Sequence, residues 1–98
     1  MMAPTEYYRG GTSLVARPKE VRFHRRTGLV LARRGISVSS RPDGLERFGG
    51  AYRVTNLPAE LQIIQVGVNP HHYEIIPVQP MPFDEYQRLL NQIVLVPA

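Results

Sequence analysis

The chain has 98 residues, which is enough for one compact domain and too few for two, so we expect a single domain over residues 1–98. Hydrophobic residues make up 43% of the chain, which excludes a wholly disordered protein, and the lack of cysteine excludes a disulfide framework, a thiolate metal site and a cysteine nucleophile. The net charge of +4 is uneven, with +7 over residues 1–41 and −3 over residues 42–98, so the basic part can attract nucleic acid, a phosphate-rich ligand or an acidic protein.

Short strands and turns are expected along most of the chain, because nine prolines and eight glycines interrupt it. β-branched and aromatic residues predict strands in six segments, at residues 7–9, 29–32, 36–39, 51–54, 61–66 and 73–78. Pro77 marks an edge strand or the end of a strand, because proline has no N–H to donate to a sheet.

Two helices are expected. A short one covers residues 43–48, and a longer one near the C-terminus begins with Asp84 and Glu85, whose charges suit the helix dipole. Apolar side chains form one face of this longer helix at three- and four-residue steps: Phe83, Tyr86, Leu89, Leu90 and Ile93. Together the elements predict an α+β fold, in which a small mixed or antiparallel β-sheet core packs against the C-terminal helix.

Neither a membrane partner nor a metal is expected. No apolar run is long enough to cross a bilayer, and residues 1–10 lack the pattern of a secretory signal. We therefore expect a cytoplasmic protein, in the producing cell or in a target cell after secretion. The three histidines, His24, His71 and His72, have no acidic or sulfur partners at a spacing that suits a metal site.

Three short segments contain residues suited to holding a phosphate-bearing ligand and acting on it. Residues 7–11 place Arg9 on a short strand before two glycines; an arginine fork binds phosphate, and glycine lets a ligand approach the backbone. Residues 35–40 place Ser37 and Ser39 on one face of a strand. Residues 72–77 place His72 and Glu74 on one face of another strand, because side chains repeat every two residues.

The order of these segments resembles the ADP-ribosyltransferase toxins with the arginine–serine–glutamate signature. In that family an aromatic-Arg-Gly strand precedes a Ser-Thr-Ser strand, which leads into a short helix ending in Phe. The last strand carries Gln-x-Glu or Glu-x-Glu, followed by an aliphatic pair and Pro. The corresponding residues here are Tyr8-Arg9-Gly10, Ser37-Val38-Ser39 with Leu45 and Phe48 after it, and His72-Tyr73-Glu74-Ile75-Ile76-Pro77. Residues 72–81 resemble still more closely the small ADP-ribosyltransferase-like effectors of type VI secretion.

The resemblance implies a reduced ADP-ribosyltransferase-like fold and a toxin that takes NAD as its substrate. Breaking the nicotinamide–ribose bond develops positive charge on the ribose, which a fixed carboxylate stabilises. The resemblance assigns this catalytic role to Glu74. It assigns binding of the NAD phosphates to Arg9, and orientation of Glu74 or of the ribose to Ser37.

Further NAD-binding and acceptor residues follow from the same resemblance. Gly10 would offer its backbone to the nicotinamide amide, and Ser39 would support the serine strand. Stacking on the nicotinamide ring is expected from one of three tyrosines: Tyr8, Tyr52 and Tyr73. His72 is expected to contact the acceptor.

Two departures from the family pattern leave the reaction's outcome open. His72 stands where many members have Gln or Glu, and Val38 stands where they have Thr. The protein either transfers ADP-ribose to an acceptor, which is a protein, a nucleic acid or a small molecule, or hydrolyses NAD. A toxin of this kind also implies an immunity or antitoxin partner, which we expect to be acidic because residues 1–41 carry +7.

Two alternatives to an active enzyme also fit the sequence. The first is a non-enzymatic nucleic-acid-binding or protein-interaction module, because seven of the twelve basic residues lie between Arg17 and Arg34. The second is an inactive relative of the family that only docks a partner.

Overall fold

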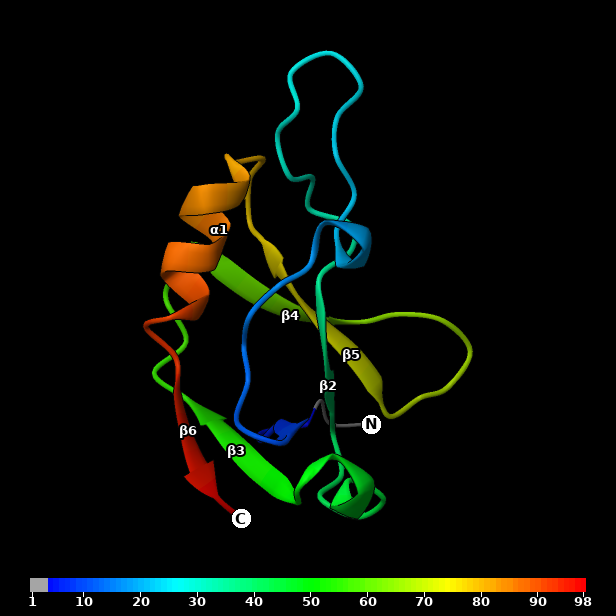
Figure 1. The fold of residues 1–98 in the computed structure, drawn as a ribbon. Helices are drawn as coiled ribbons and strands as arrows, with labels where there is room; N and C mark the ends of the chain where they lie inside the picture. The colour runs from blue at the N-terminus through cyan, green and yellow to red at the C-terminus, as the bar shows by residue number, and fades with distance from the viewer. Residues whose placement is uncertain (1–3) are drawn as a thin grey trace.

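A six-stranded antiparallel sheet forms the body of the computed structural model, which describes residues 4–98 (Figure 1). The first three residues of the expected domain lie outside the described residues. The strands are β1 (Tyr8–Gly10), β2 (Ile36–Ser39), β3 (Ala51–Thr55), β4 (Leu61–Gln65), β5 (His72–Pro77) and β6 (Val94–Pro97), and their order in the sheet is β4-β5-β2-β1-β3-β6. One α-helix, α1 (Phe83–Leu90), and two 3-10 turns, η1 (Pro18–Glu20) and η2 (Glu46–Phe48), complete the elements of the described residues. The predicted α+β class is confirmed.

The core lies between one face of the sheet and α1. Helix α1 follows Pro82 as its N-cap and carries Asp84 and Glu85 in its first turn, as predicted. Its buried residues are Tyr86, Leu89 and Leu90, and they pack against side chains that β2, β4 and β5 direct to the same side: Ile36, Val38, Leu61 and Ile75. Burial of these apolar side chains stabilises the fold by roughly 1.5–3 kcal/mol each.

Most predicted strands agree with the observed ones, but the strand predicted over residues 29–32 is wrong. In that segment Val30 forms only isolated bridges, with Phe23 and with Met81. The side chain of Val30 is buried because it packs in the core close to the segment before α1, although residues 29–32 add no strand to the sheet.

Three other elements differ from the prediction. Strand β6 was not predicted, because Ile93 continues the apolar spacing of the helix although α1 ends at Leu90. The expected helix over residues 43–48 is the shorter turn η2, and η1 was not predicted. Pro77 is the last residue of β5, as expected for a proline in a sheet.

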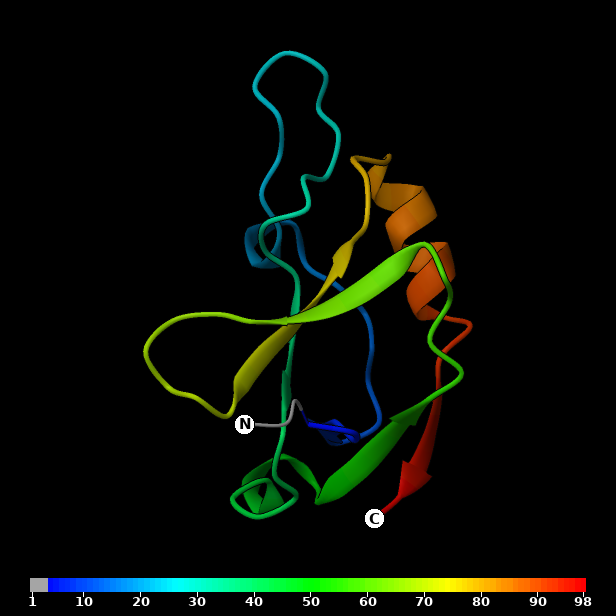
Figure 2. The same cartoon turned by 180° about the vertical axis from the view of Figure 1, so that it is seen from behind.

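Residues 21–34 extend away from the sheet as a long excursion between η1 and β2, which we call the basic arm (Figure 1, Figure 2). It contains five of the twelve basic residues of the chain. The arm returns to the sheet at Gly35, the residue before β2.

Within residues 4–98, no helix has the length and apolar character needed to cross a membrane.

Candidate functional site

The three signature strands are neighbours in the middle of the sheet, in the order β5-β2-β1. Ser37 lies directly opposite Glu74, and Ser39 lies directly opposite His72 on one side and Tyr8 on the other. Residues that face each other across an antiparallel pair point to the same side of the sheet. Side chains far apart in the sequence therefore gather on one face.

A cleft of about 500 Å³ opens beside β1 and β2. These strands share a single residue pair, Tyr8 with Ser39, whereas β2 and β5 share four. The loss of pairing beyond that point leaves room between β1 and β2, and η2 adjoins the opening with Phe48. The cleft is lined by six of the predicted site residues: Tyr8, Arg9, Gly10, Ser37, Ser39 and His72.

Three other hollows among the described residues are comparable in size, but they lack the arginine and the serine of the signature. One of about 510 Å³ lies in the basic arm, one of about 700 Å³ lies beside Ala98, and one of about 480 Å³ lies beside Leu61. None of them is lined by Arg9 or Ser37. The chemistry of its lining, rather than its volume, therefore identifies the cleft as the candidate site.

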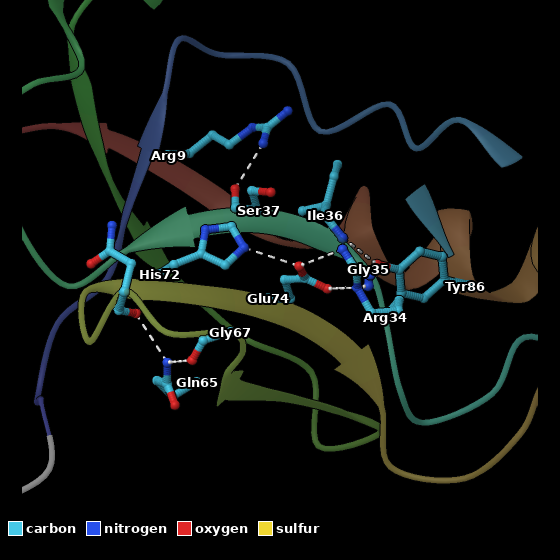
Figure 3. A network of polar contacts seen from close by, with 11 residues as sticks. Arg9, Arg34, Gly35, Ile36, Ser37, Gln65, Gly67, His72, Glu74 and Tyr86 are labelled. Carbon is cyan, nitrogen blue, oxygen red and sulfur yellow. Dashed lines mark hydrogen bonds and ion pairs between the residues drawn. The ribbon is translucent and has the colours of Figure 1, made fainter. Parts of the chain in front are cut away.

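Arg9 is held at the cleft by two main-chain carbonyls. Its Nε donates to the carbonyl of Ser13 at 3.0 Å, and its Nη1 donates to the carbonyl of Ser37 at 2.7 Å, the contact that Figure 3 shows. Burial lowers the pKa of Arg9, but a guanidinium remains charged in proteins. Two of its five N–H groups fix the side chain in this way, so a partly buried positive charge has a defined position in the cleft.

Glu74 is a buried carboxylate with hydrogen bonds to both oxygens; the residue is 1% exposed (Figure 3). Oε1 accepts from Arg34 Nε and from the Gly35 N–H, both at 3.0 Å, and Oε2 accepts from Arg34 Nη2 at 3.2 Å. Nε2 of His72 lies 3.0 Å from Oε2 and must donate, because an ionised carboxylate only accepts. Burial alone raises the pKa of Glu74, but the hydrogen bonds from Arg34, Gly35 and His72 outweigh it and keep the pKa below its usual range.

His72 connects Glu74 to the cleft. Its side chain is 36% exposed, lines the cleft and contacts the carboxylate on the same face of β5. The side chain of Glu74 itself does not line the cleft. A ligand in the cleft would thus meet His72 first and Glu74 behind it.

Tyr86 and Gly35 fix the backbone beside Glu74. The Tyr86 hydroxyl donates to the carbonyl of Ile75 at 2.6 Å and accepts from the N–H of Ile36 at 3.1 Å, which joins the start of β2 to β5. Burial raises the pKa of Tyr86 to about 12, so the phenol stays neutral. A Cβ on Gly35 would lie 1.9 Å from the carbonyl oxygen of Ile75, so only glycine fits there.

The serine side chains are close to the cleft but play different parts. Ser37 is exposed, and its main-chain carbonyl, rather than its hydroxyl, binds Arg9. The Ser39 hydroxyl accepts from the N–H of Arg41 at 3.1 Å, which supports the end of β2. Gly10 is also needed at its position, because a Cβ there would lie 2.8 Å from the ring of Phe48.

Two of the three candidate tyrosines lie away from the cleft. Tyr52 lies opposite Arg9 in β3 and is not part of the cleft lining. Tyr73 points to the apolar side of the sheet, where its ring packs against Tyr7 with centroids 5.0 Å apart. Of the three, Tyr8 alone lines the cleft.

Sequence reasoning did not identify Arg34, Gly35 or Tyr86 as parts of the site. Arg34 is one of many arginines in a basic run, and its partner lies 40 residues further along the chain. A signal was nonetheless present, because a glutamate in an apolar strand such as β5 needs a positive partner when it is buried.

No protein-family model, curated protein or solved structure gives a significant match to this chain. Within residues 4–98, no cluster of three or more His, Cys, Asp or Glu side chains is arranged to hold a metal ion.

Proposed function

We propose that this protein is a toxin of the ADP-ribosyltransferase type, which binds NAD in the cleft and cleaves its nicotinamide–ribose bond. One observation carries the proposal: the arginine, serine and glutamate of the signature, from three distant segments, meet at Ser37. Arg9 binds the carbonyl of Ser37 at 2.7 Å, and Glu74 lies directly across from Ser37 on β5. The adjacency of β1, β2 and β5 also favours a reduced ADP-ribosyltransferase-like fold.

The size and charge of the cleft suit a dinucleotide. Its volume of about 500 Å³ lies within the usual range for small-molecule sites. Arg9, Arg17 and Arg47 line it, whereas Glu20 is the one carboxylate in the lining and is paired with Arg17 at 3.5 Å. Arginine forks bind phosphate with two parallel hydrogen bonds, so the diphosphate of NAD would lie beside Arg9.

The reaction requires a negative charge close to the ribose. Nicotinamide leaves with the electrons of the bond that breaks, and the ribose carbon becomes positively charged. The buried, ionised Glu74 stabilises that charge most strongly because little water surrounds it. Arg34 binds the carboxylate of Glu74 from the exposed side with two N–H donors. A ribose hydroxyl can replace one of these two donors without leaving Glu74 unpaired.

His72 lies where an acceptor would approach. It lines the cleft and contacts Glu74, so a nucleophile that adds to the ribose carbon would pass beside its ring. The acceptor is water in NAD hydrolysis and a target molecule in ADP-ribose transfer. A toxin of this kind also implies an immunity partner, and the arginines that line the cleft favour an acidic one.

Expression in the cytoplasm of a bacterium tests the toxin assignment. We expect the parent protein to arrest growth and Glu74→Gln to permit it. Glu60→Gln is the matched control, because Glu60 is exposed and its replacement removes the same charge. Growth arrest that persists in Glu74→Gln at equal protein levels would contradict the assignment.

A further inference from the structure

The basic arm carries positive side chains that the cleft does not use. Arg22, Arg25, Arg26 and Arg33 are exposed and line a hollow of about 510 Å³ together with His24. No carboxylate lines this hollow, and within residues 4–98 none of the four arginines forms an ion pair. Four guanidinium groups therefore line one concave surface outside the cleft.

The tip of the arm is held in a defined shape by its own hydrogen bonds. The N–H of His24 donates to the carbonyl of Leu29 at 2.8 Å, and the N–H of Gly28 donates to the carbonyl of His24 at 2.9 Å. Nδ1 of His24 accepts from the N–H groups of Arg26 and Thr27 at 3.1 and 3.2 Å. The arginines of the tip therefore project from an ordered turn.

The base of the arm is attached to the segment before α1. The N–H of Val30 donates to the carbonyl of Met81 at 2.7 Å, and the N–H of Met81 donates back at 3.1 Å. The ring of Phe23 packs near that of Phe83, with centroids 5.9 Å apart. Because the arm is fixed at both its tip and its base, binding a ligand there costs little ordering entropy.

We propose that the basic arm binds the phosphate backbone of nucleic acid. Guanidinium groups pair with phosphate oxygens in two parallel hydrogen bonds, and four of them surround this hollow. An acidic protein partner is disfavoured because the centres of protein interfaces combine arginine with several aromatic anchors. Phe23 is the one aromatic residue of the arm, and its ring is engaged with Phe83.

Binding of this kind depends on charge more than on sequence. Each neutralised phosphate releases condensed counterions, so affinity falls steeply as salt rises. With Phe23 already engaged, base stacking adds little, and the arm should accept single strands and duplexes without strong sequence preference. The inference does not rest on NAD cleavage, because the arm lies outside the cleft lining.

Fluorescence anisotropy with labelled oligonucleotides, between about 50 and about 200 mM salt, tests the inference. If the four arginines each neutralise one phosphate, the slope of log affinity against log salt is about −3.6 for duplex DNA and about −2.8 for a single strand. The double variant Arg25→Gln/Arg26→Gln should reduce these slopes by about 1.8 and about 1.4, because two contacts are lost. Nicotinamide release from NAD should be unchanged in this variant. The two measurements therefore distinguish a failure of the nucleic-acid inference from a failure of the proposed NAD cleavage.

The control is Arg41→Gln/Arg88→Gln, which removes the same charge from exposed positions outside the arm. It should keep the slope of the parent protein. An equal loss in the control would overturn the inference, because net charge alone would then explain the binding. Absence of binding at about 50 mM salt would overturn it as well. Polyglutamate that binds as tightly as the oligonucleotides would also overturn the inference, since the arm would then be a site for an acidic protein.

Discussion

The cleft and the basic arm both contain arginines, but they hold them in opposite ways. In the cleft, Arg9 is partly buried and is bound by the carbonyls of Ser13 and Ser37. In the arm, the four arginines around the hollow are exposed, and among residues 4–98 none of them forms an ion pair, although the backbone of the arm is held by hydrogen bonds. A fixed guanidinium suits one ligand in one orientation, whereas several exposed guanidinium groups suit a polymer that offers phosphates at many positions.

Arg34 and Gly35 stand at the junction of the two regions. Arg34 is the last residue of the arm, yet its guanidinium binds Glu74 beside the cleft. Gly35 donates its N–H to the same carboxylate and precedes β2. Substitutions at the junction should therefore behave like changes to the core, whereas neighbouring substitutions in the arm should be mild.

The largest effect is expected for Gly35→Ala. The added Cβ would lie 1.9 Å from the carbonyl oxygen of Ile75 and 2.6 Å from the Tyr86 hydroxyl, so β2 and β5 must separate. We expect a loss of about 3 kcal/mol in the free energy of unfolding, measured by urea denaturation followed by circular dichroism.

Gly28→Ala is the matched control in the arm. Gly28 has a φ of 70°, but nothing lies within 4 Å of its added Cβ, so only the backbone strain of about 1–2 kcal/mol remains. Equal losses for the two alanines would show that the junction is no more tightly packed than the arm.

An intermediate effect is expected for Arg34→Gln. The change removes two charged hydrogen bonds from a buried carboxylate. Because the Arg34 side chain is 58% exposed, water can replace part of the interaction, and we expect a loss of stability smaller than that of Gly35→Ala. Arg33→Gln, one residue earlier and without such a partner among residues 4–98, should change stability very little. The same denaturation experiment measures both, and matching values would contradict the role of Arg34.

The smallest effect concerns pH. Burial raises the pKa of Glu74, but Arg34, Gly35 and His72 together keep it below that of an unfolded glutamate, about 4.3. The ionised Glu74 therefore contributes to the free energy of unfolding. This contribution is fully present above the unfolded pKa and is lost as pH falls through the folded pKa. Denaturation of the parent protein and of Glu74→Gln, repeated as the pH is lowered from neutral into acid, should therefore give stability curves that converge as the pH falls below the unfolded value and through the lower folded pKa of Glu74. Parallel curves would mean that Glu74 is not stabilised as its contacts indicate.

Local patterns predicted much of the fold. The alternating residues 36–39 form β2 with the predicted bounds, and the apolar spacing of Tyr86, Leu89 and Leu90 corresponds to the buried face of α1. The prediction failed where pairing depends on distant residues. An apolar segment such as 29–32 reads as a strand, but its bridges to Phe23 and Met81 depend on how the arm folds back.

The site was predictable as a set of residues but not as a network. The strand pattern placed His72 and Glu74 on one face, and the structure brings Nε2 of His72 within 3.0 Å of the carboxylate. The strand pattern does not give the register between strands. Neither the pairing of Arg34 with Glu74 nor the position of Tyr52 outside the cleft could therefore be predicted from the sequence. Both depend on contacts between segments that lie far apart in the chain.

Nicotinamide release measures most directly whether this protein cleaves NAD with Glu74 as its catalytic carboxylate. One-dimensional proton NMR of the purified protein with NAD, alone and with a cell lysate as a source of acceptor, would follow the reaction. We predict free nicotinamide from the parent protein and from Glu60→Gln, and none from Glu74→Gln. No nicotinamide from the parent protein under either condition, or undiminished release from Glu74→Gln, would contradict the account.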